Sequence, residues 1–224
     1  MCSPQFDDEV VVAPAGVPSP GRLTMPTNAR GVVMSAGIGH GIRHHVGGPQ
    51  VGSSHLGTLR FELLSDEELR DDHHEADVEI LAIRFLAVTR WVRRLPACAA
   101  LPVGLLGAGT AGVAAIWAAS EDTEIGAVVA RDSRLEQVRG RLPAVFAPTL
   151  LVVEAGDPEV RLQNERSGRR LRCEHRIAMI TEGTSRDGRD QRDAGDRLAC
   201  EWFVDHLGRP PAAGRRSPDR SPRL

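Results

Sequence analysis

The sequence contains no lysine and no tyrosine. All 28 basic residues are arginines, which excludes a lysine Schiff base, a P-loop lysine and a tyrosine general acid. An excess of one charge is also missing, because 30 acidic residues give a formal net charge of -2 and an isoelectric point near 6.5. This balance gives no electrostatic reason to expect nucleic acid or an anionic membrane as a partner, and we predict neither.

Paired cysteines and long apolar runs are absent as well. The four cysteines, Cys2, Cys98, Cys173 and Cys200, lie far apart and form no C-x-x-C pair, so neither a zinc site nor a redox pair is indicated. No stretch approaches about 18 consecutive apolar residues, and the first residues lack the basic and apolar regions of a signal peptide. We therefore predict a cytoplasmic protein with free thiols, no metal and no cofactor.

The length of 224 residues and the apolar content of 41% allow one sizeable core. We predict a single domain over residues 1–207. From Gly208 onward proline, arginine and serine dominate, which is typical of a disordered extension, so residues 208–224 are predicted to be a tail. Its short length and lack of aromatics favour a solvated tail over one that binds nucleic acid.

Apolar runs of strand length alternate with segments of helical periodicity. The clearest helix covers residues 76–95, where apolar residues recur every three or four positions until Pro96 ends it. The order of elements predicts an α/β fold with a mostly parallel central sheet and helices on both faces. Strands are expected at residues 9–13, 21–25, 31–35, 59–64, 103–106, 125–130, 149–153 and 177–180, and helices at 76–95, 110–120, 159–172 and 194–207.

One connection fits this scheme poorly. Between Gly39 and Gly57, in the connection between the strands predicted at 31–35 and 59–64, glycine and proline disfavour a helix. We predict a loose loop there. Three histidines, His40, His44 and His45, fall in it without regular ligand spacing, and we interpret them as part of a solvated polar loop and not as metal ligands.

The run Gly107-Ala108-Gly109-Thr110-Ala111-Gly112 joins a predicted strand to a predicted helix and fits two chemistries. The first is the dinucleotide-binding G-x-G-x-x-G, with Asp132 about 20 positions on to bind a ribose. That fingerprint normally follows the first strand of its sheet, whereas several strands precede it here. The second is the G-x-S-x-G nucleophile elbow, with Gly109 in place of the serine.

From about residue 8 to residue 207 the chain resembles the dienelactone-hydrolase-like α/β-hydrolases of the small bacterial type. The resemblance implies an α/β-hydrolase fold and an esterase or lactone-hydrolase ancestry. It is carried by Gly31-Val32-Val33-Met34 leading into Ala36-Gly37-Ile38-Gly39, by residues 61–64, by Gly107-Ala108-Gly109-Thr110, by residues 147–153 with Gly156-Asp157 after them, and by Leu171-Arg172-Cys173-Glu174.

The resemblance also implies where a Ser-Asp-His triad would lie. Asp157 matches the acid position, whereas Gly109 occupies the nucleophile position and Ser185 the position of the base. A triad without nucleophile and base loses on the order of 10⁶ in kcat. The resemblance therefore predicts a protein of hydrolase ancestry whose catalysis is impaired or lost, a pseudoenzyme.

Three hypotheses remain open at this point. The first is a non-catalytic homologue that binds a small acyl or lactone-like ligand at the strand ends. The second is an active hydrolase in which another hydroxyl, such as that of Thr110, or a metal-bound water replaces the serine. The third is an NAD(P)-binding protein that uses Gly107, Gly109, Gly112 and Asp132. Asp157 also has a structural interpretation, as a cap before Pro158 at the start of a helix. The sequence does not predict an oligomeric state.

Overall fold

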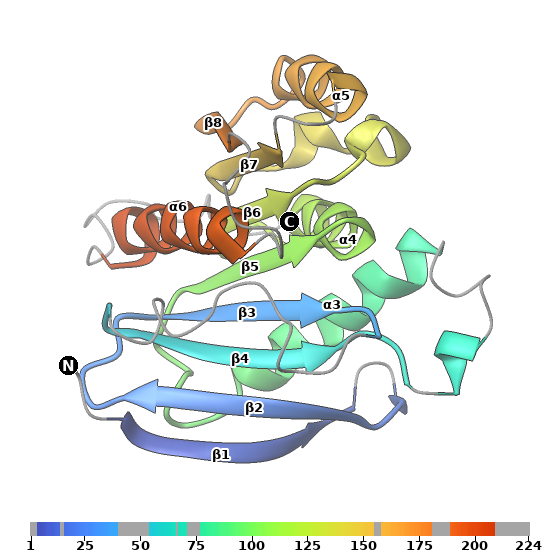
Figure 1. Cartoon of the computed structure of the whole chain (residues 1–224). Helices are drawn as coiled ribbons and strands as arrows, with labels where there is room; N and C mark the ends of the chain where they lie inside the picture. The colour runs from blue at the N-terminus through green and yellow to red at the C-terminus, as the bar shows by residue number, and fades with distance from the viewer. Residues whose placement is uncertain are drawn as a thin grey trace, which may run out of the picture.

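A computed structural model describes residues 4–13, 16–39, 54–65, 67–70, 77–154, 158–180 and 189–208. Its strands form one eight-stranded sheet in the order β1-β2-β4-β3-β5-β6-β7-β8 (Figure 1). β1 pairs antiparallel with β2, and β2 pairs antiparallel with β4, whereas all other neighbours are parallel. The strands are β1 (Pro4–Val12), β2 (Ser19–Pro26), β3 (Gly31–Gly37), β4 (Leu56–Glu62), β5 (Val103–Ala108), β6 (Ile125–Arg131), β7 (Thr149–Glu154) and β8 (His175–Ile180).

Helices cover both faces of this sheet. α3 (Val78–Val92), α4 (Thr110–Glu121) and α5 (Pro158–Gly168) lie on one face, and α6 (Arg189–Leu207) lies on the other (Figure 1). Short 3-10 turns interrupt the connections at η3 (Glu68–Arg70), η4 (Leu135–Val138) and η5 (Leu142–Ala144). Within the described ranges, no helix combines the length and the apolar character that crossing a bilayer requires.

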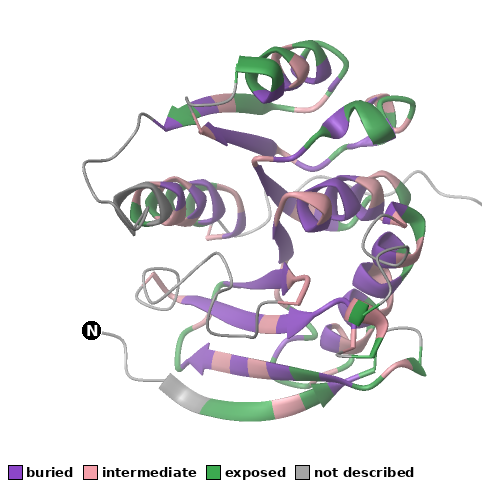
Figure 2. Cartoon of the chain, turned by 45° about the vertical axis from the view of Figure 1, so that its right-hand side comes forward, coloured by how far each residue is buried: buried purple, intermediate pink, exposed green. Residues whose placement is uncertain are grey.

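Two clusters of buried side chains flank the sheet. The larger one lies beneath α3 and α4, and in it the rings of Phe61 and Phe85 meet edge to face at 5.6 Å between centroids. The smaller one lies beneath α6 and contains Phe203. The central strands are coloured as buried over most of their length, and the helices that flank them are coloured partly as buried (Figure 2). Removal of this apolar surface from water is the main force that holds helices and sheet together. The predicted α/β fold, with a mostly parallel central sheet and helices on both faces, is confirmed.

The predicted elements are all present, with shifted ends. α5 ends at Gly168 instead of residue 172. A Cβ on Gly168 would lie 3.1 Å from the side chain of Ile177 on β8. α6 begins at Arg189, earlier than the predicted residue 194, and β4 covers residues 56–62 instead of 59–64. The glycine-rich connection predicted to be a loop falls mainly on residues 40–53, outside the described part of the chain.

The antiparallel end of the sheet is polar on the side that faces away from α3. Arg22 on β2 forms two hydrogen bonds to the carboxylate of Asp7 on β1, and Thr24 forms a third. Arg60 on β4 lies opposite Arg22, and partial burial lowers the pKa of its guanidinium. Because these side chains are charged or hydroxylated, this surface does not need a helix to cover it.

Candidate functional site

The junction of β5 and α4 has the backbone geometry of a nucleophile elbow. Gly109 connects the two elements with φ 55° and ψ -127°. Its N–H donates to the carbonyl oxygen of Arg131 at 2.8 Å, which ties the turn to the neighbouring strand β6. A Cβ placed on Gly109 would meet no atom within 4 Å. A side chain at this position would therefore extend into open space.

The two neighbouring glycines of the motif are required by packing. A Cβ on Gly107 would lie 2.5 Å from the carbonyl carbon of Ala111, so the first turn of α4 rests directly on β5. A Cβ on Gly112 would lie 2.1 Å from the hydroxyl oxygen of Ser133, which follows β6. These contacts explain Gly107 and Gly112 by close approach of helix and strand.

The start of α4 offers donors instead of a nucleophile. Thr110 is the first helical residue, as predicted, and Gly109 occupies the N-cap position without any capping side chain. The first N–H groups of an α-helix have no acceptor inside the helix, and the helix dipole places partial positive charge there. Beside Gly109 these groups form a suitable environment for a carbonyl or carboxylate oxygen.

The loop after β3 borders the same edge of the sheet. Glu62, at the end of β4, is 6% exposed, and its carboxylate accepts a hydrogen bond from the N–H of Gly39 at 3.0 Å. Gly39 has φ 76°, and a Cβ there would lie 2.6 Å from the side chain of Leu69 in η3. β4 and η3 together hold this loop close to the end of β3.

A nearly buried ion pair anchors η3 to α3. The guanidinium of Arg84 donates to both carboxylate oxygens of Glu68, at 2.5 and 2.8 Å, and to the carbonyl oxygen of Leu63 at 2.7 Å. The side chains are 6% and 18% exposed. The hydrogen bonds from Arg84, followed by those from Ser65, lower the pKa of the Glu68 carboxyl to about 2. Such bidentate arginine pairs fix geometry well.

Asp132, which immediately follows β6, spans two strand ends. Its N–H donates to the carbonyl oxygen of Val152, and its carboxylate accepts from the N–H of Glu154, both at 2.8 Å. Its φ of 47° is unusual for a residue other than glycine. Burial is the main cause that raises the pKa of this carboxyl. One carboxylate oxygen is thus already bonded to the protein backbone.

Arg131, the last residue of β6, is buried. Its side chain is 5% exposed, and its guanidinium lies 3.4 Å from Asp132, 3.3 Å from Glu154 and 3.8 Å from Asp196 of α6. A Cβ on Gly195 would lie 2.7 Å from a guanidinium nitrogen. The arginine fills space beneath the first half of α6, which the apolar strand pattern of β6 had hidden.

The structure brings some predicted residues together and separates others. Gly109 and Asp132 lie at the carboxyl ends of the adjacent strands β5 and β6. Pro158 opens α5, as predicted. Asp157 and Ser185 lie outside the described residues, as do His40, His44 and His45. In the described ranges no group of three or more His, Cys, Asp or Glu side chains is placed to hold a metal ion.

Sequence reasoning missed the polar residues that brace this edge. Glu62 was visible as a single acid within the apolar stretch Phe61-Glu62-Leu63-Leu64, which is a signal of a buried, bonded carboxylate. The Glu68–Arg84 pair joins residues that are 16 positions apart, and no local sequence pattern predicts such a contact.

Comparison with solved structures shows a close relative over nearly the whole chain. A dienelactone hydrolase from Anabaena variabilis is 33% identical in sequence and superposes with a TM-score of 0.79. The match covers 91% of this chain and 99% of the hydrolase chain. Est1E from Butyrivibrio proteoclasticus has a TM-score of 0.72 over 90% of this chain at 12% identity, which indicates a shared fold. No family model matches the chain.

Curated relatives give a second comparison. Two proteins from Mycobacterium tuberculosis strains, each named "Putative phosphoribosyl transferase", are 36% identical over 219 residues. The match covers 94% of this chain but 49% of each relative. The chain therefore spans about half the length of the curated relatives it matches.

Proposed function

The chain belongs to the dienelactone-hydrolase-like α/β-hydrolases, and from this premise we propose that it is a member without hydrolase catalysis that binds a small acyl or lactone-like ligand at the strand ends. The observation that carries the proposal is Gly109. Its turn keeps the φ and ψ of an elbow while bringing no nucleophilic atom. Ser185 at the position of the base and Asp157 at the position of the acid complete the proposed remnant of a triad.

The binding part of the proposal follows from what remains at the junction. The first N–H groups of α4 provide donors for a carbonyl or carboxylate oxygen, and the space beside Gly109 is open. An ester or lactone has the same oxygen acceptor as the corresponding acid. A ligand of this class would be held at its carbonyl, and no covalent bond to Gly109 could form.

Covalent labelling tests the catalytic half of this proposal. We expect the wild-type chain to resist acylation by a fluorophosphonate probe and to hydrolyse short p-nitrophenyl esters no faster than a heat-killed sample. A Gly109→Ser/Ser185→His double substitution restores both side chains and serves as the comparison. Labelling of the wild type at Thr110 or at any serine, well above a denatured control, would show that a substitute nucleophile operates.

Ligand binding needs a separate measurement. Short-chain carboxylic acids and lactones should raise the unfolding temperature of the wild-type chain. Saturable binding at a hundredfold excess over Kd stabilises a protein by about 2.7 kcal/mol, so a genuine site is detectable. Gly109→Leu should abolish the shift by filling the open space. A panel of such acids and lactones that leaves the unfolding temperature unchanged would refute the binding half.

An NAD(P)-binding function is the second candidate, favoured by the position of Asp132 directly after β6. Two features weigh against it. The motif follows β5 in the middle of the sheet, and the Asp132 carboxylate already accepts from the Glu154 N–H. We expect NAD and NADP to leave the unfolding temperature unchanged. A thermal shift that disappears in Asp132→Ala would instead support this candidate.

The curated relatives are named phosphoribosyl transferases, and about half of each lies outside the match with this chain. The half that matches this chain has an α/β-hydrolase fold here. We therefore assign the phosphoribosyl transfer that their name implies to the part of those proteins outside the match. For this chain we propose a cytoplasmic protein without a resident cofactor.

A further inference from the structure

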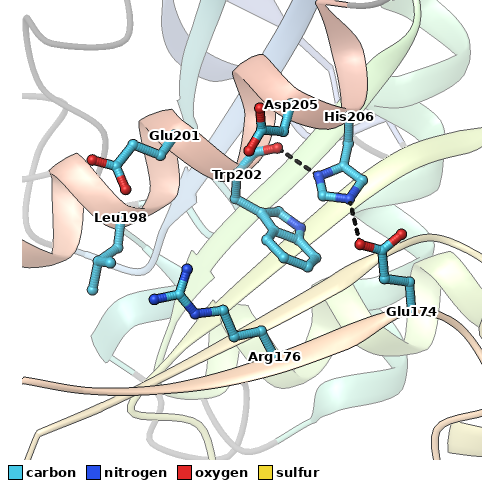
Figure 3. A pocket seen from close by; sticks show the side chains of 7 residues that line it. All are labelled: Glu174, Arg176, Leu198, Glu201, Trp202, Asp205 and His206. Carbon is cyan, nitrogen blue, oxygen red and sulfur yellow. Dashed lines mark hydrogen bonds and ion pairs between the residues drawn. The ribbon is translucent and has the colours of Figure 1, made fainter.

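A groove separates the second half of α6 from the edge strand β8. It encloses about 250 Å³. Its lining comes from α6 and from the residues at the start of β8 (Figure 3). Its apolar wall consists of Leu198 and the ring of Trp202, and this ring stacks on His206 at 4.1 Å between centroids. The Trp202 indole N–H donates to the carbonyl oxygen of Pro148 at 3.3 Å, which holds the ring in place.

The rim of this groove is acidic. Glu201 and Asp205 extend from α6, and Glu174 approaches from the start of β8, where it lies 3.4 Å from His206. Arg176 is the one arginine among the side chains that line this groove. Glu201 and Asp205 are both exposed and both lie near the C-terminal end of α6, where the helix dipole adds partial negative charge. The groove therefore favours a cation.

The chain continues from α6 with a segment of opposite charge. Gly208 lies one turn beyond Asp205, and its N–H donates to the carbonyl oxygen of Val204 at 3.0 Å. Residues 209–224 contain five arginines and one aspartate, whereas the whole chain has a net charge of -2. An extended chain advances about 3.3 Å per residue, so this segment has ample length to return to the groove.

We propose that residues 209–224 bind back onto the α6–β8 groove of the same chain, with an arginine side chain placed between the rim carboxylates and against the Trp202 ring. A guanidinium can bond to carboxylates and stack on an aromatic face at the same time. Tethering favours the chain's own segment over a free peptide, because a short linker gives an effective concentration in the millimolar range. This inference is independent of the function proposed for the Gly109 site.

Tryptophan indole resonances of the full-length chain test the proposal. The three residues Trp91, Trp117 and Trp202 each give one N–H signal in a 15N-labelled sample. We expect Arg215→Gln/Arg216→Gln to displace the Trp202 signal and to leave the signals of the other two in place. Raising the salt concentration to about 0.5 M should move the wild-type Trp202 signal in the same direction, because screening weakens exposed charge pairs.

Limited trypsin digestion supplies an independent readout. Cleavage after Arg215 and Arg216 should be about fivefold slower in the wild type than in Glu201→Gln/Asp205→Asn, as expected if the segment is bound about 80% of the time. Glu159→Gln/Glu165→Gln, which neutralises two acids of α5, is the matched control and should behave as the wild type.

Three results would overturn the inference. The first is a Trp202 signal that does not respond to Arg215→Gln/Arg216→Gln. The second is an equal cleavage rate in the wild type and the groove variant. The third is a response that grows with protein concentration, because this would place the segment on another copy of the chain. Circular dichroism of Arg215→Gln/Arg216→Gln should match that of the wild type, which separates the first result from a loss of folding.

Discussion

Gly109 has the backbone conformation of a nucleophile elbow and no side chain. Substitutions there can distinguish the energetic effect of the positive φ from the effect of steric clashes. A Cβ at this position meets no atom, so any loss of stability in Gly109→Ala must come from φ 55°. We expect a loss of about 1–3 kcal/mol in the free energy of unfolding, measured by urea denaturation.

Gly140 provides the matched control for that measurement. A Cβ there also meets nothing, and its φ is not positive, so Gly140→Ala should be neutral or stabilising by up to about 1 kcal/mol. Equal effects of the two substitutions would contradict the strained-turn interpretation of Gly109.

Asp132 is the residue where charge and hydrogen bonding act in opposite directions. Burial raises the pKa of its carboxyl, so the charged form destabilises the folded state and stability rises as pH falls through the folded pKa. Asparagine tolerates positive φ and keeps the acceptor for the Glu154 N–H. We expect Asp132→Asn to be at least as stable as the wild type at pH 8 by thermal denaturation, and Asp132→Ala to be less stable by about 1–2 kcal/mol.

At the scale of elements, the Glu68–Arg84 pair connects η3 to α3. The pKa of Glu68 is lowered from 4.5 to about 2, so the pair contributes fully above about pH 5 and is lost as pH falls toward 2. Between about pH 5 and pH 2 the unfolding free energy of the wild type should fall more than that of Glu68→Gln, by on the order of 2 kcal/mol. Urea titrations at successive pH values measure both.

Asp7 is the control, because its pKa is also lowered to about 2 by hydrogen bonds from Arg22 and Thr24. Those partners lie on an exposed face, with side chains 34% and 43% exposed for Asp7 and Arg22. Solvent screening should limit the effect of Asp7→Asn to about 0.5 kcal/mol. A larger effect for Asp7 than for Glu68 would mean that burial does not determine the contribution of these pairs.

Elements were predictable from the sequence because their signals are local. Apolar runs and periods of three and four located the strands and α-helices of the described residues, and the β5–α4 turn followed from Gly107, Gly109 and Gly112. The polar bracing was not predictable in the same way. Arg131 ends an apolar strand, and its burial depends on α6, which begins 58 positions later at Arg189. Contacts of this range depend on how the elements assemble, which no window of sequence contains.

For the whole molecule, the two buried clusters share the same strands. On β5, Leu105 faces the cluster under α3 and α4, whereas Leu106 faces the cluster under α6, because successive side chains point to opposite faces. Phe203 of α6 lies directly over Gly104 of the same strand, 2.6 Å from where a Cβ would be. Neither face can lose its packing without disturbing the strand that supports the other.

We therefore propose that residues 1–207 form one domain that unfolds in a single cooperative step. Trp117 on α4 and Trp202 on α6 report on opposite faces of the sheet. Their indole signals should lose native intensity at the same urea concentration, and far-ultraviolet circular dichroism should give the same midpoint, as two-state unfolding requires. If the Trp202 signal is lost at a clearly lower urea concentration than the Trp117 signal, α6 detaches first and the sheet supports two separately stable layers. Deleting residues 209–224 serves as the control, since these residues follow the proposed domain in the chain and their removal should leave the two midpoints coincident.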